Sequence, residues 1–425
     1  MGDLRRWHRR IFAASWLSYF SYYFTRKPFS ATKTALQAQF GLSKGQLNYI
    51  DTGYNALYCI GMFVNGAVID SVGPRRWVSI GMLTSAVLAV VFAGVSSVTG
   101  SVLGIYMLVW GINGLAQSSG WPGNSKVMAA WWSTEERGPV MGFWSTCYNA
   151  GGLVATLVCA RLLATFGWRG AFLGPAIWVA VVGVAFYALV RDRPSDVGFP
   201  DPDTVAVNRE ERVAAMRAAR REILRNPMVW AMGGAYFACK VIRYALLFWL
   251  PYYLEKALAY DAVQSNELST AFEAGGVVLV VVAGYVADRV LGKRRVLTAF
   301  LSMLGLVGAL FLYRAVGDTG TLPNICALML VGGFLFAADS LISGAVAQDM
   351  SGPHAAALAA GVVNGVGSIG QVFQGFLLVY VSDKYGWPTL FNIFAGLAFL
   401  GSLMCIPYLR VRPRGVPDLP RAAVR

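Results

Sequence analysis

Long apolar runs separated by short polar breaks follow one another along almost the whole chain. The first begins at Ile11 and the last ends at Leu409. Each run is close to the roughly 20 residues that a helix needs to cross a hydrocarbon core. The pattern predicts about twelve spans, at residues 11–37, 47–69, 77–97, 102–128, 139–164, 170–190, 228–256, 266–287, 296–315, 324–348, 356–381 and 387–409. We therefore expect an all-α membrane protein whose main surroundings are the lipid bilayer.

One long polar segment interrupts this pattern. It covers residues 191–227, contains several prolines and ends in the charged stretch Arg209–Arg225. Six apolar runs precede it and six follow it. The segment predicts an N-terminal six-helix half at 1–190, a cytoplasmic central loop at 191–227 and a C-terminal six-helix half at 228–425.

A Gly–Asp–Arg signal recurs at equivalent places in the two halves. It follows the second and the eighth spans, as Gly66, Asp70, Gly73, Arg75 and Arg76, and as Gly284, Asp288, Gly292, Arg294 and Arg295. We expect Gly66 and Gly284 to let helices approach closely, and each aspartate to pair with basic residues or with a helix N-terminus. The arginine pairs would anchor the loops on the cytoplasmic side. Two copies at matching positions indicate pseudo-symmetric halves, and the loop resembles the signature of the major facilitator superfamily.

Composition and charge agree with a membrane protein. The chain is 56% hydrophobic and 14% charged, with a mean hydropathy of +0.53, whereas soluble domains are about 25% charged. Its net charge of +14 comes mainly from one set of short loops, which places both termini in the cytoplasm and argues against a nucleic-acid partner. The six cysteines lack the spacing of a metal site, so we expect no metal and no cofactor.

A few charged residues fall inside the apolar spans, where each costs about 2.5–3.5 kcal/mol and is a candidate for function. They are Arg26, Lys27, Lys33, Asp51, Lys240, Arg243, Glu273 and Asp339. Asp51 is alternatively a helix cap. Lys27 lies about 100° around the helix from Arg26, so the two side chains cannot point equally into one site.

The duplication relates two of these residues. Asp288 and Asp70 differ by 218 positions, and the same offset carries Arg26 to within one residue of Arg243. Equivalent helices of two halves that pack around a central pathway would bring both guanidinium groups to one cavity. Their paired donors suit a phosphate. The alternative is that each arginine is held by Glu273, Asp339 or a backbone carbonyl.

Tyrosines and a second cation accompany the arginines. Tyr22 and Tyr23 precede Arg26, and Lys240 lies one helical turn before Arg243. A tyrosine-rich polar stripe on an apolar helix suggests a hydrated cavity that offers hydroxyl groups to a polyol. Packing or interfacial tyrosines would explain the same pattern.

Four segments resemble spans of the organophosphate:phosphate antiporters, which include bacterial glycerol-3-phosphate and hexose-phosphate carriers and eukaryotic sugar-phosphate exchangers. They are Tyr22–Ser30, Gly114–Pro122 with Lys126, Lys240–Tyr244 followed by Trp249, and Gly361–Gly370. The resemblance implies that Arg26 and Arg243 match the family's phosphate-binding arginines. Departures occur at Tyr148, where glycerol-3-phosphate carriers have a histidine, at Met62, where they have a lysine, and at Asp339, where a small residue or proline is expected. Asp339 is then a substrate contact, a cation partner or a lock for Lys240.

The sequence thus predicts a monomeric secondary transporter of a bacterial inner membrane. It would exchange an organic phosphate, either a sugar phosphate or glycerol phosphate, for inorganic phosphate by alternating access. Two alternatives stay open: a proton-coupled facilitator of a non-phosphate organic anion that uses Glu273 or Asp339, and a sugar-phosphate sensor with the transporter fold. We expect no enzymatic activity, because no nucleophile–base constellation occurs.

Overall fold

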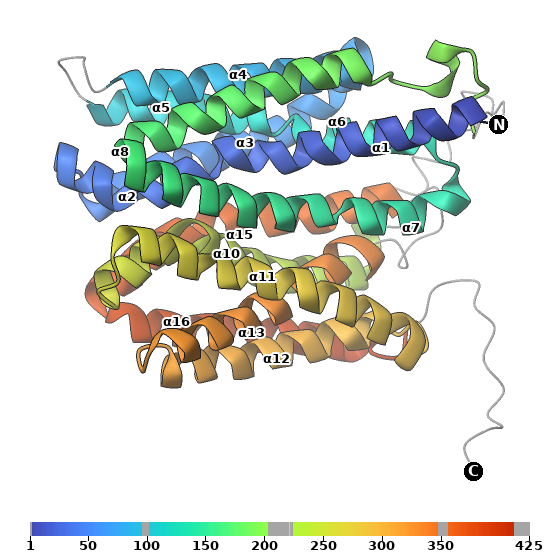
Figure 1. The fold of residues 1–425 in the computed structure, drawn as a ribbon. Helices are drawn as coiled ribbons and strands as arrows, with labels where there is room; N and C mark the ends of the chain where they lie inside the picture. The colour runs from blue at the N-terminus through green and yellow to red at the C-terminus, as the bar shows by residue number, and fades with distance from the viewer. Residues whose placement is uncertain (1, 96–101, 203–220, 222–223, 347–355, 412–425) are drawn as a thin grey trace.

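Two stacked bundles of helices make up the protein in the computed structural model, which describes residues 2–95, 102–202, 221, 224–346 and 356–411 (Figure 1). The N-terminal bundle contains α1 (Gly2–Tyr22), η1 (Tyr23–Thr25), α2 (Lys27–Phe40), α3 (Lys44–Val72), α4 (Pro74–Gly94), α5 (Val102–Gln117), α6 (Gly120–Trp131), α7 (Thr134–Trp144) and α8 (Thr146–Leu189). A short η3 (Pro194–Val197) follows it. The C-terminal bundle contains α10 (Pro227–Ala257), α11 (Ala262–Tyr285), η4 (Val286–Val290), α12 (Arg295–Val316), α13 (Thr321–Ser340), η5 (Leu341–Val346), α15 (Ala356–Lys384), α16 (Gly386–Cys405) and η6 (Ile406–Tyr408).

Several of the predicted spans consist of two or three helical pieces. The first span is α1, η1 and α2, and the fourth is α5 and α6. The long α8 turns at Gly167, whose φ of 68° is not helical, and so supplies parts of the fifth and sixth spans. Counted in this way, the described residues form the twelve spans predicted from the sequence. Eight of their helical segments are long and apolar enough to cross a membrane by length and composition alone.

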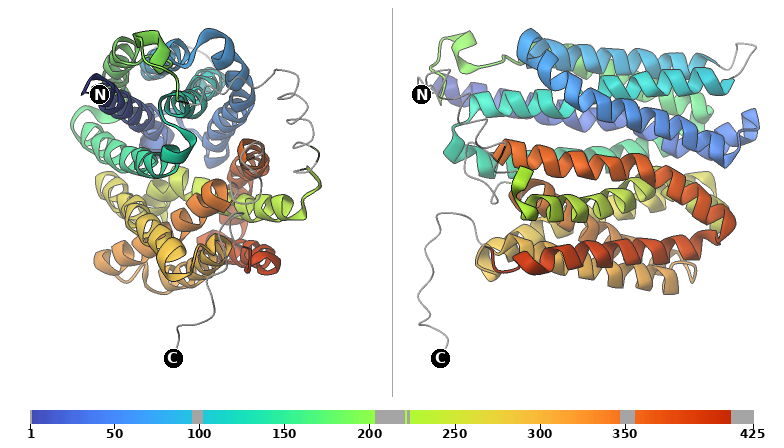
Figure 2. Two further views of the ribbon diagram at one scale, coloured as in Figure 1. Left: turned by 90° about the vertical axis from the view of Figure 1, so that its right-hand side faces the viewer. Right: turned by 180° about the vertical axis from the view of Figure 1, so that it is seen from behind.

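The two ends of the bundle differ in how the halves meet. An even number of spans brings the start of α1 and the end of α16 to one end, here called the terminal end (Figure 2). The opposite end, the distal end, contains the end of α2, the start of α3 and the connection between α10 and α11. The hydrogen bonds and ion pairs that join described residues of the two halves lie at the centre or at the distal end. They include Thr34–Glu255 at 2.7 Å, Lys44–Asp383 at 2.9 Å and Arg161–Glu267 at 2.8 Å.

Small residues set the closest helix packing. A Cβ added to Gly275 of α11 would overlap the backbone of Met329, and one added to Gly332 of α13 would overlap the backbone of Phe272. Helices in lipid pack through such small residues. The predicted close approach at Gly284 is wrong, because a Cβ there would meet nothing within 4 Å. The equivalent Gly66 lies outside the residues whose side-chain surroundings are described.

A buried ion pair fastens the distal end. Lys33 of α2 pairs with Asp51 of α3, and the two side chains are 0% and 2% exposed. The Lys33 ammonium also donates to the carbonyl oxygen of Phe248 at 2.9 Å and lies 3.5 Å from the centre of the Trp249 ring, both in α10 of the other half. Asp51 is therefore no helix cap, since α3 begins seven residues earlier and is capped by Ser43.

Replacing Asp51 with asparagine is expected to destabilise the protein by about 3–5 kcal/mol, because the buried Lys33 amine would lose its counterion in a dry site. Thermal unfolding in detergent measures the effect. The double variant Lys33→Met/Asp51→Leu should recover most of the loss, since it removes both charges. Asp383→Asn is the control, because that carboxylate is half exposed and exposed pairs contribute only about 0–1 kcal/mol. An Asp51→Asn variant as stable as the natural protein would contradict a stabilising role for the buried Lys33–Asp51 ion pair.

Candidate functional site

The first span breaks where Arg26 stands. The 3₁₀ turn η1 ends at Thr25, and α2 starts at Lys27 with Pro28 in its first turn, which is where proline is tolerated because no helical N–H is needed there. The Arg26 side chain is only 3% exposed. Its Nε donates to Oε1 of Gln117 at 2.9 Å, and its guanidinium lies 4.7 Å from the centre of the Tyr23 ring. Nη2 of Arg26 has no hydrogen-bond partner.

Arg243 lies in the middle of α10 and is held by the carboxylate of Asp339, near the end of α13. Nη1 of Arg243 donates to Oδ2 of Asp339 at 2.8 Å, and both side chains are at most 10% exposed. The guanidinium also lies 5.3 Å from the Tyr148 ring and 4.8 Å from the Phe336 ring. Nε of Arg243 and Oδ1 of Asp339 have no hydrogen-bond partner. Asp339 thus pairs with a cation, and that cation is Arg243 rather than Lys240.

Two tyrosines connect the arginines of the two halves. Tyr23 interacts electrostatically with both Arg26 and Arg243, and so does Tyr244. The Lys240 ammonium lies 5.1 Å from the centre of the Tyr244 ring. Among the described residues Lys240 has neither an ion-pair partner nor a hydrogen-bond partner. Three cations therefore gather around Tyr23 and Tyr244, in the region where the first and seventh spans face each other.

Lys27 points to a different acid. Its ammonium forms an ion pair with Glu273 of α11 at 2.6 Å, and both side chains are at most 6% exposed. The pair crosses from one half to the other beside Gly152 of α8, where a Cβ would come within 2.6 Å of the Glu273 carboxylate. The different direction of Lys27 and Arg26 follows from their adjacent positions on the chain. The partnership with Glu273 was not predicted.

The structure does not bring the Tyr22 hydroxyl into this centre. That hydroxyl donates to the carbonyl oxygen of Val78 at 3.1 Å and lies 2.9 Å from Oγ of Ser119. Its ring packs against Gly120, where a Cβ would come within 2.7 Å. Tyr22 therefore fastens α1 to α4 and α6, as the packing interpretation expects.

Three residues that surround Arg26 were given no site role from the sequence. Gln117 accepts hydrogen bonds from Arg26 and, at 3.0 Å, from the Tyr54 hydroxyl. Tyr58 lies one helical turn after Tyr54, with its ring centre 5.2 Å from the Arg26 guanidinium. The available signals were the four-residue spacing of two tyrosines in the second span and a glutamine inside an apolar run.

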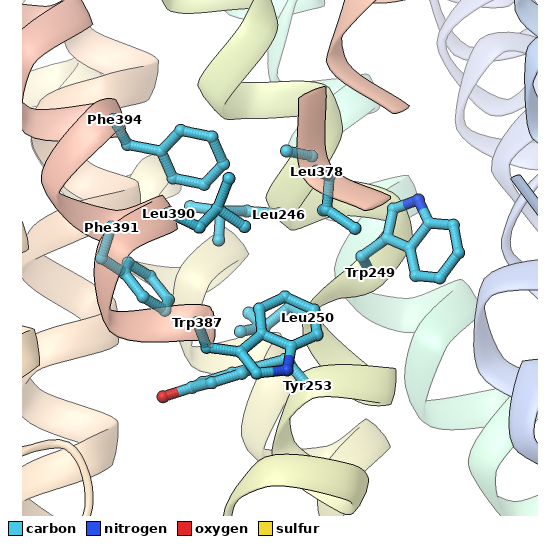
Figure 3. Close-up of a pocket in the computed structure, with 10 residues that line it drawn as sticks. Leu246, Trp249, Leu250, Tyr253, Leu378, Trp387, Leu390, Phe391 and Phe394 are labelled. Carbon is cyan, nitrogen blue, oxygen red and sulfur yellow. The ribbon is translucent and has the colours of Figure 1, made fainter. Parts of the chain in front are cut away.

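The cavity between α10, α15 and α16 is too small for a substrate. It has a volume of about 10 Å³, which is about one water molecule. Aromatic and leucine side chains line it, among them Trp249, Tyr253 and Trp387 (Figure 3). It belongs to the packing of the distal end. Among the described residues, no group of three or more His, Cys, Asp or Glu side chains could hold a metal ion.

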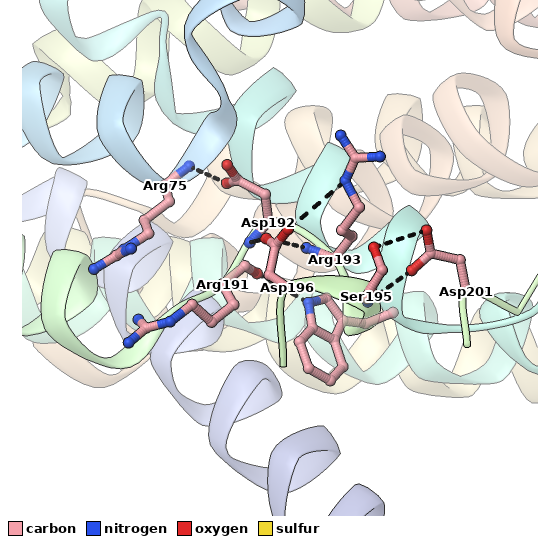
Figure 4. A network of polar contacts seen from close by, with 8 residues as sticks. Arg75, Arg191, Asp192, Arg193, Ser195, Asp196 and Asp201 are labelled. Atoms are coloured by element: carbon pink, nitrogen blue, oxygen red, sulfur yellow. Dashed lines mark hydrogen bonds and ion pairs between the residues drawn. The ribbon is translucent and has the colours of Figure 1, made fainter. Parts of the chain in front are cut away.

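The loop after α3 is held by the segment that follows α8 (Figure 4). The backbone N–H of Arg75 donates to Oδ1 of Asp192 at 2.7 Å, and its Nε donates to the carbonyl oxygen of Tyr187 at 2.6 Å. Gly73 makes the turn with a φ of 90°, against the Asp192 carboxylate. Asp192 is a partner that the repeat gave no reason to expect.

The second copy of the loop pairs its own residues. Asp288 in the π-helical turn η4 forms an ion pair with Arg295 at 3.5 Å, and Arg294 directly precedes α12. Arg76, which corresponds to Arg295 in the repeat, lies in the first turn of α4. The side chain of Asp70 lies outside the described residues.

Comparisons with known proteins agree with this architecture. The family model of the Major Facilitator Superfamily matches residues 15–266 and 235–424. Two solved structures share the fold: a bacterial homologue of the human lysosomal transporter Spinster in an inward-facing, unoccupied conformation, with a TM-score of 0.73 at 15% identity over 94% of both chains, and a D-xylose–proton symporter, with a TM-score of 0.75 at 14% identity over 96% of this chain and 98% of that one.

Curated relatives match over nearly the full length. A probable hexose phosphate transport protein of Chlamydia muridarum is 30% identical, covering 94% of this chain and 91% of the relative. The membrane sensor protein UhpC of Escherichia coli is 28% identical over 96% and 93%, and the glycerol-3-phosphate transporter of Bacillus subtilis is 28% identical over 90% and 88%. The chain therefore belongs to the major facilitator superfamily and, within it, to the organophosphate:phosphate antiporter family.

Proposed function

We propose that this protein exchanges an organic phosphate, a sugar phosphate or glycerol phosphate, for inorganic phosphate. The observation that carries the proposal is a pair of buried arginines on equivalent spans, each with an unpartnered N–H group: Nη2 of Arg26 and Nε of Arg243. Buried polar groups in folded proteins are nearly always hydrogen-bonded, so two orphaned guanidinium donors at one centre favour an anionic ligand there.

The arrangement assigns a role to each neighbour. Arg26 and Lys240 would bind the phosphate from opposite halves, and the free edge of Arg243 would add a further donor. Tyr23 and Tyr148 would border the organic part of the substrate, near Arg26 and Arg243 respectively. Lys27 and Glu273 would hold the two halves together across the centre.

Exchange follows from the charges. Without an anion, Arg26 and Lys240 repel each other across a region of low dielectric constant, which opposes the approach of the halves during reorientation. A bound phosphate neutralises them and bridges the halves, so reorientation favours the loaded carrier. The loop contacts of Arg75 with Asp192 and of Asp288 with Arg295 do not join the two halves, so they would hold each loop in place while the halves move.

The orientation of the protein in the membrane, the boundary between its halves and its oligomeric state belong to the same proposal. The terminal end, with the Arg-rich start of α1, would face the cytoplasm of a bacterial inner membrane, so the contacts at the distal end would close the outer side. The halves would divide at 191–227, and one chain would form the working unit.

Sensing is a second candidate function, because the sensor relative matches 96% of this chain at 28% identity. Proton coupling draws less support, since Glu273 and Asp339 both form ion pairs with buried cations.

Purified protein in phosphate-loaded liposomes tests these functions together. We expect uptake of labelled phosphate that competes with sugar phosphates or glycerol phosphate and is unaffected when a proton gradient is collapsed. Empty liposomes of the same lipid provide the background. Uptake that depends on the proton gradient and ignores internal phosphate would refute exchange, and binding without any uptake would favour the sensor.

A further inference from the structure

Asp339 removes one positive charge from the centre, and a site that binds phosphate through two arginines does not require such an acid. Four cations lie there: Arg26, Lys27, Lys240 and Arg243. Glu273 neutralises Lys27, and Asp339 neutralises Arg243. Among the described residues the centre therefore keeps two uncompensated positive charges, on Arg26 and Lys240.

The geometry of the Arg243–Asp339 ion pair allows it to stay intact while a substrate is bound. It uses one edge of the guanidinium, Nη1, and leaves Nε free. If a phosphate displaced Asp339, a carboxylate would stay unpaired beside another anion in a buried site, which is strongly unfavourable. An anion that uses the free Nε avoids this cost. Asp339 also directly precedes the end of α13, after which the chain continues as the π-helical turn η5, a feature that frequently marks functional positions.

We propose that Asp339 sets the charge of the substrate: the centre accepts one dianionic phosphoryl group and rejects substrates that carry a second anionic group. The inference rests on the proposed exchange function. A phosphate monoester has its second pKa near 6, so it carries close to two negative charges at pH 7.5. It balances Arg26 and Lys240. An additional carboxylate or phosphate would bring an unbalanced negative charge close to Asp339.

A pair of probes of equal carbon number tests the proposal: glycerol 3-phosphate, a dianion, and 3-phosphoglycerate, which adds one carboxylate. Each is used to inhibit labelled phosphate exchange in proteoliposomes at pH 7.5. Glycerol 3-phosphate should inhibit the natural protein at a concentration at least about tenfold lower than 3-phosphoglycerate does. Asp339→Asn leaves three uncompensated charges and should reduce or reverse that ratio, whereas Asp339→Glu should keep it.

Two controls separate charge at the centre from other effects. Asp383→Asn makes the same charge change on an exposed carboxylate of the distal end and should leave the ratio unchanged. If Asp339→Asn does not exchange phosphate, thermal stabilisation of the purified variant by the two probes gives the same comparison.

The outcomes for the two proposals are distinct. Natural protein that binds phosphate without exchanging it would refute the exchange function, while the ratio of the two probes in the binding assay would still decide the role of Asp339. An Asp339→Asn variant with the natural ratio, in exchange or in binding, would overturn that role.

Discussion

Replacing Arg26 with lysine is expected to reduce phosphate exchange about 100-fold although the positive charge is kept, because one or two charge-assisted hydrogen bonds are lost. The Arg26 guanidinium divides its donors: Nε binds Gln117 at 2.9 Å, while Nη2 stays available to the ligand. A lysine ammonium is a single point of charge and cannot bind both at the required positions. Initial exchange rates in phosphate-loaded liposomes measure the effect.

The matched control for this variant is Arg161→Lys. Arg161 forms a contact between the halves, with Glu267 at 2.8 Å, and its side chain is 76% exposed. Exposed pairs contribute little, so exchange should remain near the natural rate. Equal rates for Arg26→Lys and Arg161→Lys would remove Arg26 from the site.

Replacing Arg243 with glutamine should reduce exchange to below about 1%, and adding Asp339→Asn should restore part of the activity. The single variant leaves the Asp339 carboxylate buried and unpaired, at a cost of about 3–5 kcal/mol, in the region where phosphate must bind. The double variant removes that charge and returns the centre to two uncompensated cations. Exchange rates and phosphate-induced thermal stabilisation of both variants measure the outcome.

The role of Arg243 follows from which of these two variants exchanges and binds phosphate better. If the double variant is as inactive as the single one and binds phosphate no better, Arg243 acts through its own contacts with substrate rather than through its balance with Asp339. Asp339→Asn alone, with Arg243 intact, completes the cycle and gives the coupling between the two residues.

The sequence was most informative where the duplication applied. The recurrent Gly–Asp–Arg loops predicted two halves, and their offset related Arg26 to Arg243, which the structure brings to a common pair of tyrosines. Composition and span length predicted the helical membrane fold because each crossing requires a long apolar run.

Contacts between spans were harder to predict. In the sequence Asp51 resembles a helix cap, because hydrophobicity locates a helix start only to within a few residues. Its partner Lys33 comes from a different span, so the pair is not visible in the sequence. The pairing of Lys27 with Glu273 depends on how the two halves pack, which no local pattern encodes. Gly284 lies in open space, so its recurrence in the repeat did not translate into a close helix contact.

The dependence of phosphate efflux on external anion tests the central claim most directly. Proteoliposomes loaded with labelled phosphate are diluted into buffer without phosphate, and unlabelled phosphate is added later. Because the empty centre keeps the charges of Arg26 and Lys240 uncompensated, we expect almost no efflux before the addition and rapid efflux after it. Efflux at the same rate before and after the addition would contradict an anion-dependent reorientation of the two halves.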